Sequence, residues 1–147
     1  MATELMNDLV CDIQHAIEVD GKPDAVFRGL IDRMTRLPPG PNGQQPLSLK
    51  LEQWPGGRWF RDLGNNTGHL WGHVQSIKPP VLLEICGPMM MSFAVASNLI
   101  IRLKETGGRT EVTLRHQVLG QIPQEYRTGM TEGWAQMLNS IPGARKS

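Results

Sequence analysis

LSLKLEQWPGGRWF, residues 47–60, is the segment that decides the predicted fold. Leucines at positions 47, 49 and 51 alternate with polar residues, and this period of two is typical of a strand with one buried face. Residues 55–57, Pro-Gly-Gly, interrupt the run before residues 58–60 resume it, and glycine supplies the positive φ angles of a tight turn. The segment therefore predicts a β-hairpin, and it leaves open whether Trp54 or Trp59 faces the interior.

The remaining chain predicts one strand and one helix before this hairpin, and four strands and a long helix after it. Apolar residues alternate along residues 9–19, and they recur at helical spacing along residues 25–34 and 126–141. Later strands are expected at 69–77, 81–86, 97–105 and 110–118, and helices at 23–37 and 124–141. Strands in succession flanked by helices indicate an α+β fold, a curved antiparallel sheet closed by the C-terminal helix.

Composition narrows the class of protein. The 147 residues suit one domain, residues 1–147 with a core at about 9–141. A net charge of +1, from 15 basic and 14 acidic side chains spread along the chain, argues against a nucleic-acid partner. Signal-like and membrane-spanning apolar runs are not seen, so we expect a cytoplasmic protein without a membrane partner.

Five motifs together resemble one family. They are KPDAVFRGLID (residues 22–32), PGGRWFRD (55–62), GHVQSIKPPVLLEI (72–85), GGRTEVTLRH (107–116) and GWAQMLNSI (133–141). This set is similar to the START-like, SRPBCC superfamily, and more closely to the branch of heat-shock protein 90 ATPase activator homologues, which is also polyketide-cyclase-like. The resemblance implies the helix-grip fold, in which six or seven antiparallel strands surround the long C-terminal helix and leave a hydrophobic ligand cavity. The charge-rich N-terminal module of the true activators is not seen here, so the resemblance alone predicts no chaperone role.

A cavity between the sheet and the C-terminal helix would be lined by aromatic, methionine and other inward side chains. Methionine repacks around varied shapes at low cost, although plain core filling explains the same residues. An inward imidazole at position 116 must find a polar partner, and a ligand is one such partner. The predicted ligand-binding residues are Trp59, Trp71, Met89, Met91, Phe93, Leu114, His116, Tyr126, Met130, Trp134 and Met137.

Other polar residues give weaker signals. His69 and His73 share a predicted strand face with Trp71 but lie about 13 Å apart on a strand, which is too far for one metal ion, and we expect no metal or cofactor. Arg58, Arg61 and Asp62 at the hairpin form either a solvated ion-pair cluster or a contact to a polar ligand head. Cys11 and Cys86 are expected to be buried free thiols.

The leading functional hypothesis is binding of a hydrophobic or amphipathic small molecule. A second is a cyclase, dehydratase or isomerase acting on a polyketide-like or aromatic substrate, with His116 and either Tyr126 or Glu84 as proton carriers, although no catalytic motif is visible. A third is a chaperone-associated interaction module. A homodimer formed through sheet edges or the methionine segment is compatible with each of these.

Overall fold

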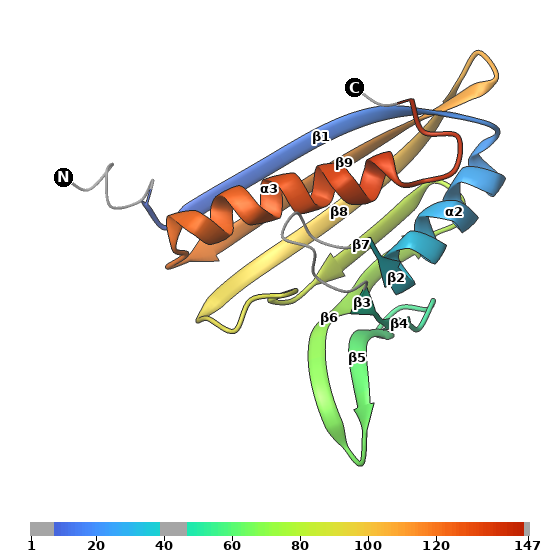
Figure 1. Cartoon of the computed structure of the whole chain (residues 1–147). Helices are drawn as coiled ribbons and strands as arrows, with labels where there is room; N and C mark the ends of the chain where they lie inside the picture. Colours follow the sequence, from blue (N-terminus) through green and yellow to red (C-terminus); the bar gives the residue numbers. More distant parts are fainter. Residues whose placement is uncertain (1–7, 39–46, 146–147) are drawn as a thin grey trace.

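The computed structural model describes residues 8–38 and 47–145, and its centre is a seven-stranded antiparallel sheet (Figure 1). The strand order is β1-β9-β8-β7-β6-β5-β4, while β2 and β3 form a separate pair. The sheet is open, so the predicted α+β helix-grip architecture is confirmed with seven strands. The elements are β1 (Val10–Asp20), α2 (Pro23–Thr35), β2 (Arg36–Leu37), β3 (Leu47–Ser48), β4 (Lys50–Leu51), β5 (Arg58–Gly64), β6 (Thr67–Lys78), β7 (Leu82–Cys86), β8 (Val95–Thr106), β9 (Arg109–Gly120) and α3 (Gln124–Asn139).

One face of the sheet, here called the inner face, is covered by α3 and α2 (Figure 1). In β9 every second residue from Thr110 to Val118 is buried, and the intervening residues point to the opposite, outer face. This alternation follows from the two-residue period of a strand and produces one apolar and one polar surface. The core therefore lies between the inner face and the two helices.

The deciding hairpin forms, but its first strand is divided. Leu47–Ser48 pair with β2, whereas Lys50–Leu51 pair with Phe60 and Trp59 of β5. The turn requires glycine, because a Cβ atom at Gly57 would lie 2.2 Å from the carbonyl oxygen of Glu52. Trp59 is fully buried and Trp54 is 57% exposed, so the open question of which tryptophan faces inward is answered by Trp59.

The β5–β6 hairpin extends beyond the rest of the sheet (Figure 1). Its tip uses Asn65 and Asn66, both in the left-handed region at φ 53° and 59°. Two such residues suit the turn that matches the twist of paired strands, and asparagine tolerates this conformation better than most residues. Register shifts at Trp59/Phe60 and Asp62/Gly64 bend the hairpin away from regular pairing.

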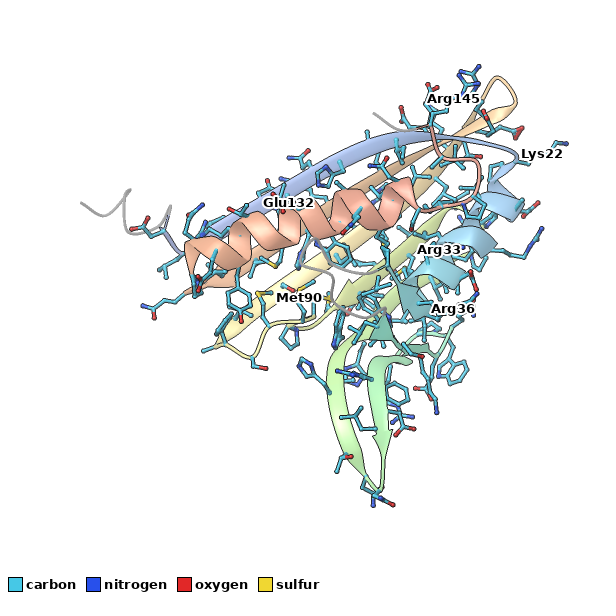
Figure 2. All side chains as sticks on the ribbon, viewed as in Figure 1. Lys22, Arg33, Arg36, Met90, Glu132 and Arg145 are labelled. Atoms are coloured by element: carbon cyan, nitrogen blue, oxygen red, sulfur yellow. The ribbon has the colours of Figure 1, made fainter. Side chains whose placement is uncertain are left out.

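The C-terminal end of the described chain returns to β1. Helix α3 ends at Asn139, two residues earlier than position 141, where the apolar pattern placed its end. Gly143 then accepts a hydrogen bond from the backbone N–H of Asp20, at 2.9 Å, and Ala144 forms a bridge with Val19. Arg145, labelled in Figure 2, donates its backbone N–H to the carbonyl of Glu18 at 2.9 Å. This segment covers the end of an edge strand.

Candidate functional site

His116 lies at the centre of the inner face and is fully buried. The indole Nε1–H of Trp134 donates to its Nδ1 at 3.0 Å, and its Nε2 lies 3.1 Å from the hydroxyl oxygen of Ser97. The Ser97 hydroxyl donates to the carbonyl of Gly87, so the imidazole must donate from Nε2 to Ser97. Two protein side chains thus supply the polar partners that an inward histidine needs.

Burial sets the charge of this histidine. Removal from water lowers the pKa of His116 to about 4, because a buried imidazolium loses its hydration and gains no carboxylate in return. The side chain is therefore neutral near pH 7. The neutral form also fits its contacts, because an imidazolium would point a second N–H at the Trp134 indole donor.

Three tryptophans form a cluster beside His116. The rings of Trp59 and Trp71 meet edge to face with centroids 4.9 Å apart, and the rings of Trp59 and Trp134 stack at 6.3 Å. The indole of Trp59 donates to the carbonyl of Met34 in α2 at 3.0 Å. The cluster joins α2, the sheet and α3, which places it at the point where a helix-grip domain is held together.

The connection between β7 and β8 contributes buried methionines to the core, and together with those of α3 they are called here the methionine wall. Met89 and Met91 are buried, and Met90 lies below α3 in Figure 2. Met89 adopts a left-handed backbone at φ 59°, an uncommon conformation for a residue with a side chain, and its N–H donates to the carbonyl of Trp71 at 2.8 Å. From α3, Met130 and Met137 join the same core.

At one end of this wall the rings of Phe93 and Tyr126 meet edge to face, with centroids 4.8 Å apart. Tyr126 is 40% exposed and Phe93 is half-buried, so the pair stands where the β7–β8 connection approaches the start of α3. Nine of the eleven predicted ligand-binding residues are buried in the same core, and these two lie at its margin. Their role in ligand binding stays a prediction.

Two of the candidate catalytic residues, Glu84 and His116, lie on opposite faces of the sheet. Glu84 lies on the outer face, where it accepts hydrogen bonds from Ser76 and Asn98 at 2.8 Å each, whereas His116 lies on the inner face. A single substrate cannot contact both. Cys86 is half-buried on the outer face, with the Asn98 amide 3.3 Å from its sulfur, so the expectation of two buried thiols is wrong for Cys86.

The remaining histidines are dispersed. His15 lies 2.9 Å from the carbonyl of Thr131, and the ring of His69 lies 6.4 Å from that of Trp71. His73 is exposed beside Arg58, because a register shift changes the face of β6, and the predicted shared face with Trp71 is wrong for it. Among the described residues, no group of three or more histidine, cysteine or acidic side chains is placed to hold a metal ion.

Two of the three charged residues predicted at the hairpin, Arg58 and Asp62, form separate ion pairs. Arg58 binds Glu52 through Nε at 2.8 Å, and this contact lowers the pKa of Glu52 to about 2. Lys50 binds Asp62 at 3.1 Å on the neighbouring strand. These exposed pairs fit the alternative of a solvated ion-pair cluster.

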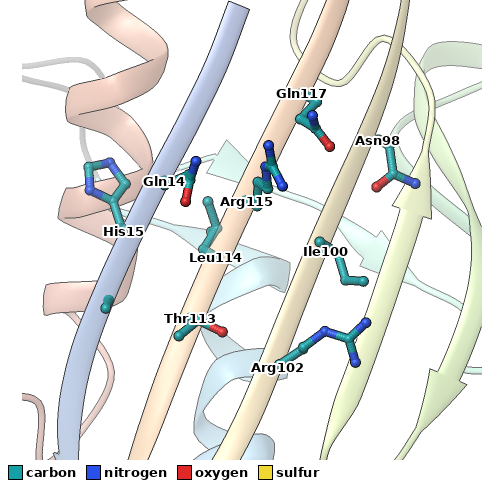
Figure 3. A pocket seen from close by; sticks show the side chains of 10 residues that line it. Gln14, His15, Asn98, Ile100, Arg102, Thr113, Leu114, Arg115 and Gln117 are labelled. Atoms are coloured by element: carbon teal, nitrogen blue, oxygen red, sulfur yellow. The ribbon is translucent and has the colours of Figure 1, made fainter.

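The outer face holds a depression that, apart from Leu114, the predicted site did not include (Figure 3). It has a volume of about 610 Å³ and is lined from β1, β9 and β8. The polar positions of these alternating strands were its signal in the sequence. The lining residues are Gln14, His15, Ala16, Asn98, Ile100, Arg102, Thr113, Leu114, Arg115 and Gln117.

An open antiparallel sheet that grips a C-terminal helix over an aromatic and methionine-rich core defines the helix-grip class of START-like domains. Residues 20–144 match the family model described as Activator of Hsp90 ATPase homolog 1-like protein. The chain belongs to this family. A search of curated proteins finds no match.

Solved structures share the fold at low sequence identity. CalU16 from Micromonospora echinospora has a TM-score of 0.62 and 21% identity, covering 88% of this chain and 73% of that one. The Aha1 dimer from Colwellia psychrerythraea has a TM-score of 0.60 and 14% identity, covering 88% and 92%. StfQ, a di-domain ARO/CYC from the steffimycin biosynthetic pathway, has a TM-score of 0.64 and 13% identity, covering 95% of this chain and 51% of StfQ. No helix in the described part of the chain is long and apolar enough to cross a membrane.

Proposed function

We propose that this protein binds a hydrophobic or amphipathic small molecule between the inner face of the sheet and α3. The observation that carries the proposal is the methionine wall: the left-handed Met89 and the buried Met91 and Met130 belong to the core against which Phe93, the partner of Tyr126, packs. Thioether side chains change rotamer at low cost, so such a wall admits a ligand by repacking. Membership of the family supports the same class of function.

Hydrogen bonds anchor two residues of the β7–β8 connection, and the residues that follow them are the part that moves when a ligand enters. Met89 is held through its N–H by the Trp71 carbonyl, and Gly87 is held through its carbonyl by Ser97. Residues 90–94 lie between these anchors and β8, and they carry Phe93. A ligand enters when Phe93 separates from Tyr126, while the His116 and tryptophan contacts stay closed.

An enzyme acting on a polyketide-like substrate is the second candidate, favoured by the fold shared with StfQ. In this mechanism a pocket orients an apolar substrate and His116 moves a proton. Both imidazole nitrogens are already bonded, to Trp134 and Ser97, so turnover first requires one of these two contacts to open. Ligand binding alone requires no such rearrangement, so we rank it as the first candidate function.

The test is a fluorescence titration with 1-anilinonaphthalene-8-sulfonate, together with native mass spectrometry of protein purified from its own host. We expect saturable binding of one probe molecule and a retained small molecule in the purified protein. Phe93→Ala should weaken probe binding and speed its association, because the ring pair at the margin of the wall is lost.

Phe60→Ala is the matched control, because Phe60 is also half-buried but lies on β5 beneath Arg58. Equal effects of the two substitutions, or failure of the probe to saturate, would overturn the assignment of the inner face. Thermal unfolding of each variant separates loss of the site from loss of the fold.

A further inference from the structure

The outer-face depression is lined by successive cross-strand pairs of β8 and β9 (Figure 3). Ile100 of β8 stands opposite Arg115 of β9, and the flanking pairs are Asn98 with Gln117 and Arg102 with Thr113. An apolar floor is thus surrounded by groups that bear guanidinium, amide and hydroxyl functions. The volume of about 610 Å³ lies in the range of small-molecule sites.

The charged side chains that line the depression are basic. Arg102 and Arg115 line the depression, and none of the lining residues is acidic. Asp12, from the edge strand, binds Arg115 through two contacts, Nε to Oδ1 at 3.1 Å and Nη2 to Oδ2 at 2.8 Å. This bidentate pair fixes the guanidinium plane and leaves its Nη1 donors available.

Arg102 is the uncommitted charge. Its guanidinium makes no ion pair or hydrogen bond with any residue in the described ranges 8–38 and 47–145, whereas that of Arg109, on the same pair of strands, binds Glu18 at 3.2 Å. Its cross-strand neighbours are Leu82 and Thr113, and neither carries a charge. A second guanidinium in the same depression as a fixed one suits an anion that the protein itself does not supply.

A carboxylate on β7, across from Ile100, is already occupied. Glu84 takes one hydrogen bond from Ser76 and one from the Asn98 amide nitrogen. With its nitrogen so held, Asn98 presents its amide oxygen as an acceptor. Donors and an acceptor are therefore fixed around the apolar Ile100 floor before any ligand arrives.

We propose that this depression is a binding site, separate from the inner face, for a small molecule that bears a carboxylate or phosphate group. Arg102 and the Nη1 group of Arg115 bind the oxyanion. The amide groups of Asn98 and Gln117 bind its hydroxyl or amide groups, and Ile100 contacts its carbon skeleton. Charge complementarity and size carry this assignment, which does not depend on the function proposed for the inner face.

The test is a two-dimensional amide NMR titration of the full chain with citrate, inorganic phosphate and glycerol at constant ionic strength. Saturable shifts confined to residues 98–102 and 113–117 are expected with one or both anions, and none with glycerol. A preference for citrate assigns a carboxylate ligand, and a preference for phosphate assigns a phosphoryl ligand. Binding too weak to saturate for both anions would overturn the proposal.

Arg102→Gln should weaken anion binding by about tenfold or more, as expected for losing a charge-assisted hydrogen bond. Arg109→Gln is the control, because it removes the same charge from β9 outside the depression. If both variants weaken binding equally, the anions respond to net charge and the site is refuted. Because 1-anilinonaphthalene-8-sulfonate is itself an anion, it reports the inner face where its binding responds to Phe93→Ala and is unchanged by Arg102→Gln.

Discussion

The two faces of β8 and β9 differ in how their polar groups are used. On the inner face, the ring of His116 and the hydroxyl of Ser97 form a closed chain from the Trp134 indole to the Gly87 carbonyl. On the outer face, the side chain one position further along β9, Gln117, lines an open depression. The inner polar groups thus hold the fold together, whereas outer side chains such as Arg102 and Gln117 have no partner among the described residues.

Removal of the Trp134 side chain should produce the largest effect. Trp134→Ala leaves a cavity in the core and an unpaired Nδ1 on His116, and we expect a loss of about 4 kcal/mol in the free energy of unfolding. Urea unfolding followed by circular dichroism measures it. Trp54→Ala is the control, with an expected change within about 0.5 kcal/mol because Trp54 is exposed. Similar losses of stability for both variants would contradict the conclusion that the inner polar groups hold the fold together.

The second-largest effect should come from acid, which lowers the free energy of unfolding by protonating His116. The pKa of His116 is about 4 when folded and near 6.5 when unfolded, so the unfolded chain binds more protons between these values. The stability present above pH 6.5 is lost as the pH falls toward 4, by about 3 kcal/mol for this one group. His116→Gln should remove that part of the pH dependence of urea unfolding. An unchanged profile in the variant would show that other groups cause the acid sensitivity.

Replacing a serine on each face by alanine should cause smaller losses of stability that differ between the two faces. Ser97→Ala leaves the His116 Nε2–H and the Gly87 carbonyl unpaired, with an expected loss of about 2 kcal/mol in the free energy of unfolding. Ser76→Ala removes a hydroxyl that bonds Glu84 on the outer face, where water can replace it, so its loss should be less than half as large. The same urea titrations measure both, and the reverse order would contradict the division between the faces.

The sequence predicts strands and parity well because both depend on local alternation. Alternation along residues 110–118 correctly placed His116 inward. Its partners are 18 and 19 residues away, on a helix and a neighbouring strand, and such contacts depend on how elements pack. The bulge at Trp59/Phe60 resets parity for a similar reason, since register shifts arise between strands.

The two candidate sites were not equally visible in the sequence. The inner set could be predicted because apolar residues at strand and helix spacing converge on one core. The outer depression was missed because the polar positions of the same strands were treated as solvated. Only the structure shows that Arg102 lacks a partner among the described residues while Arg115 is fixed by Asp12. Neither property follows from the spacing of residues along a strand.

The return of the C-terminal segment to β1 also governs how this sheet meets other chains. Alternate backbone groups of an edge strand point away from its neighbour. At one end, the Val10 carbonyl accepts from Arg127; at the other, the Glu18 carbonyl and Asp20 N–H bind residues 143–145. These contacts occupy outward-facing backbone groups at both ends of β1 and shorten the edge that is free to pair with a foreign strand. The domain thereby limits edge-to-edge aggregation along β1.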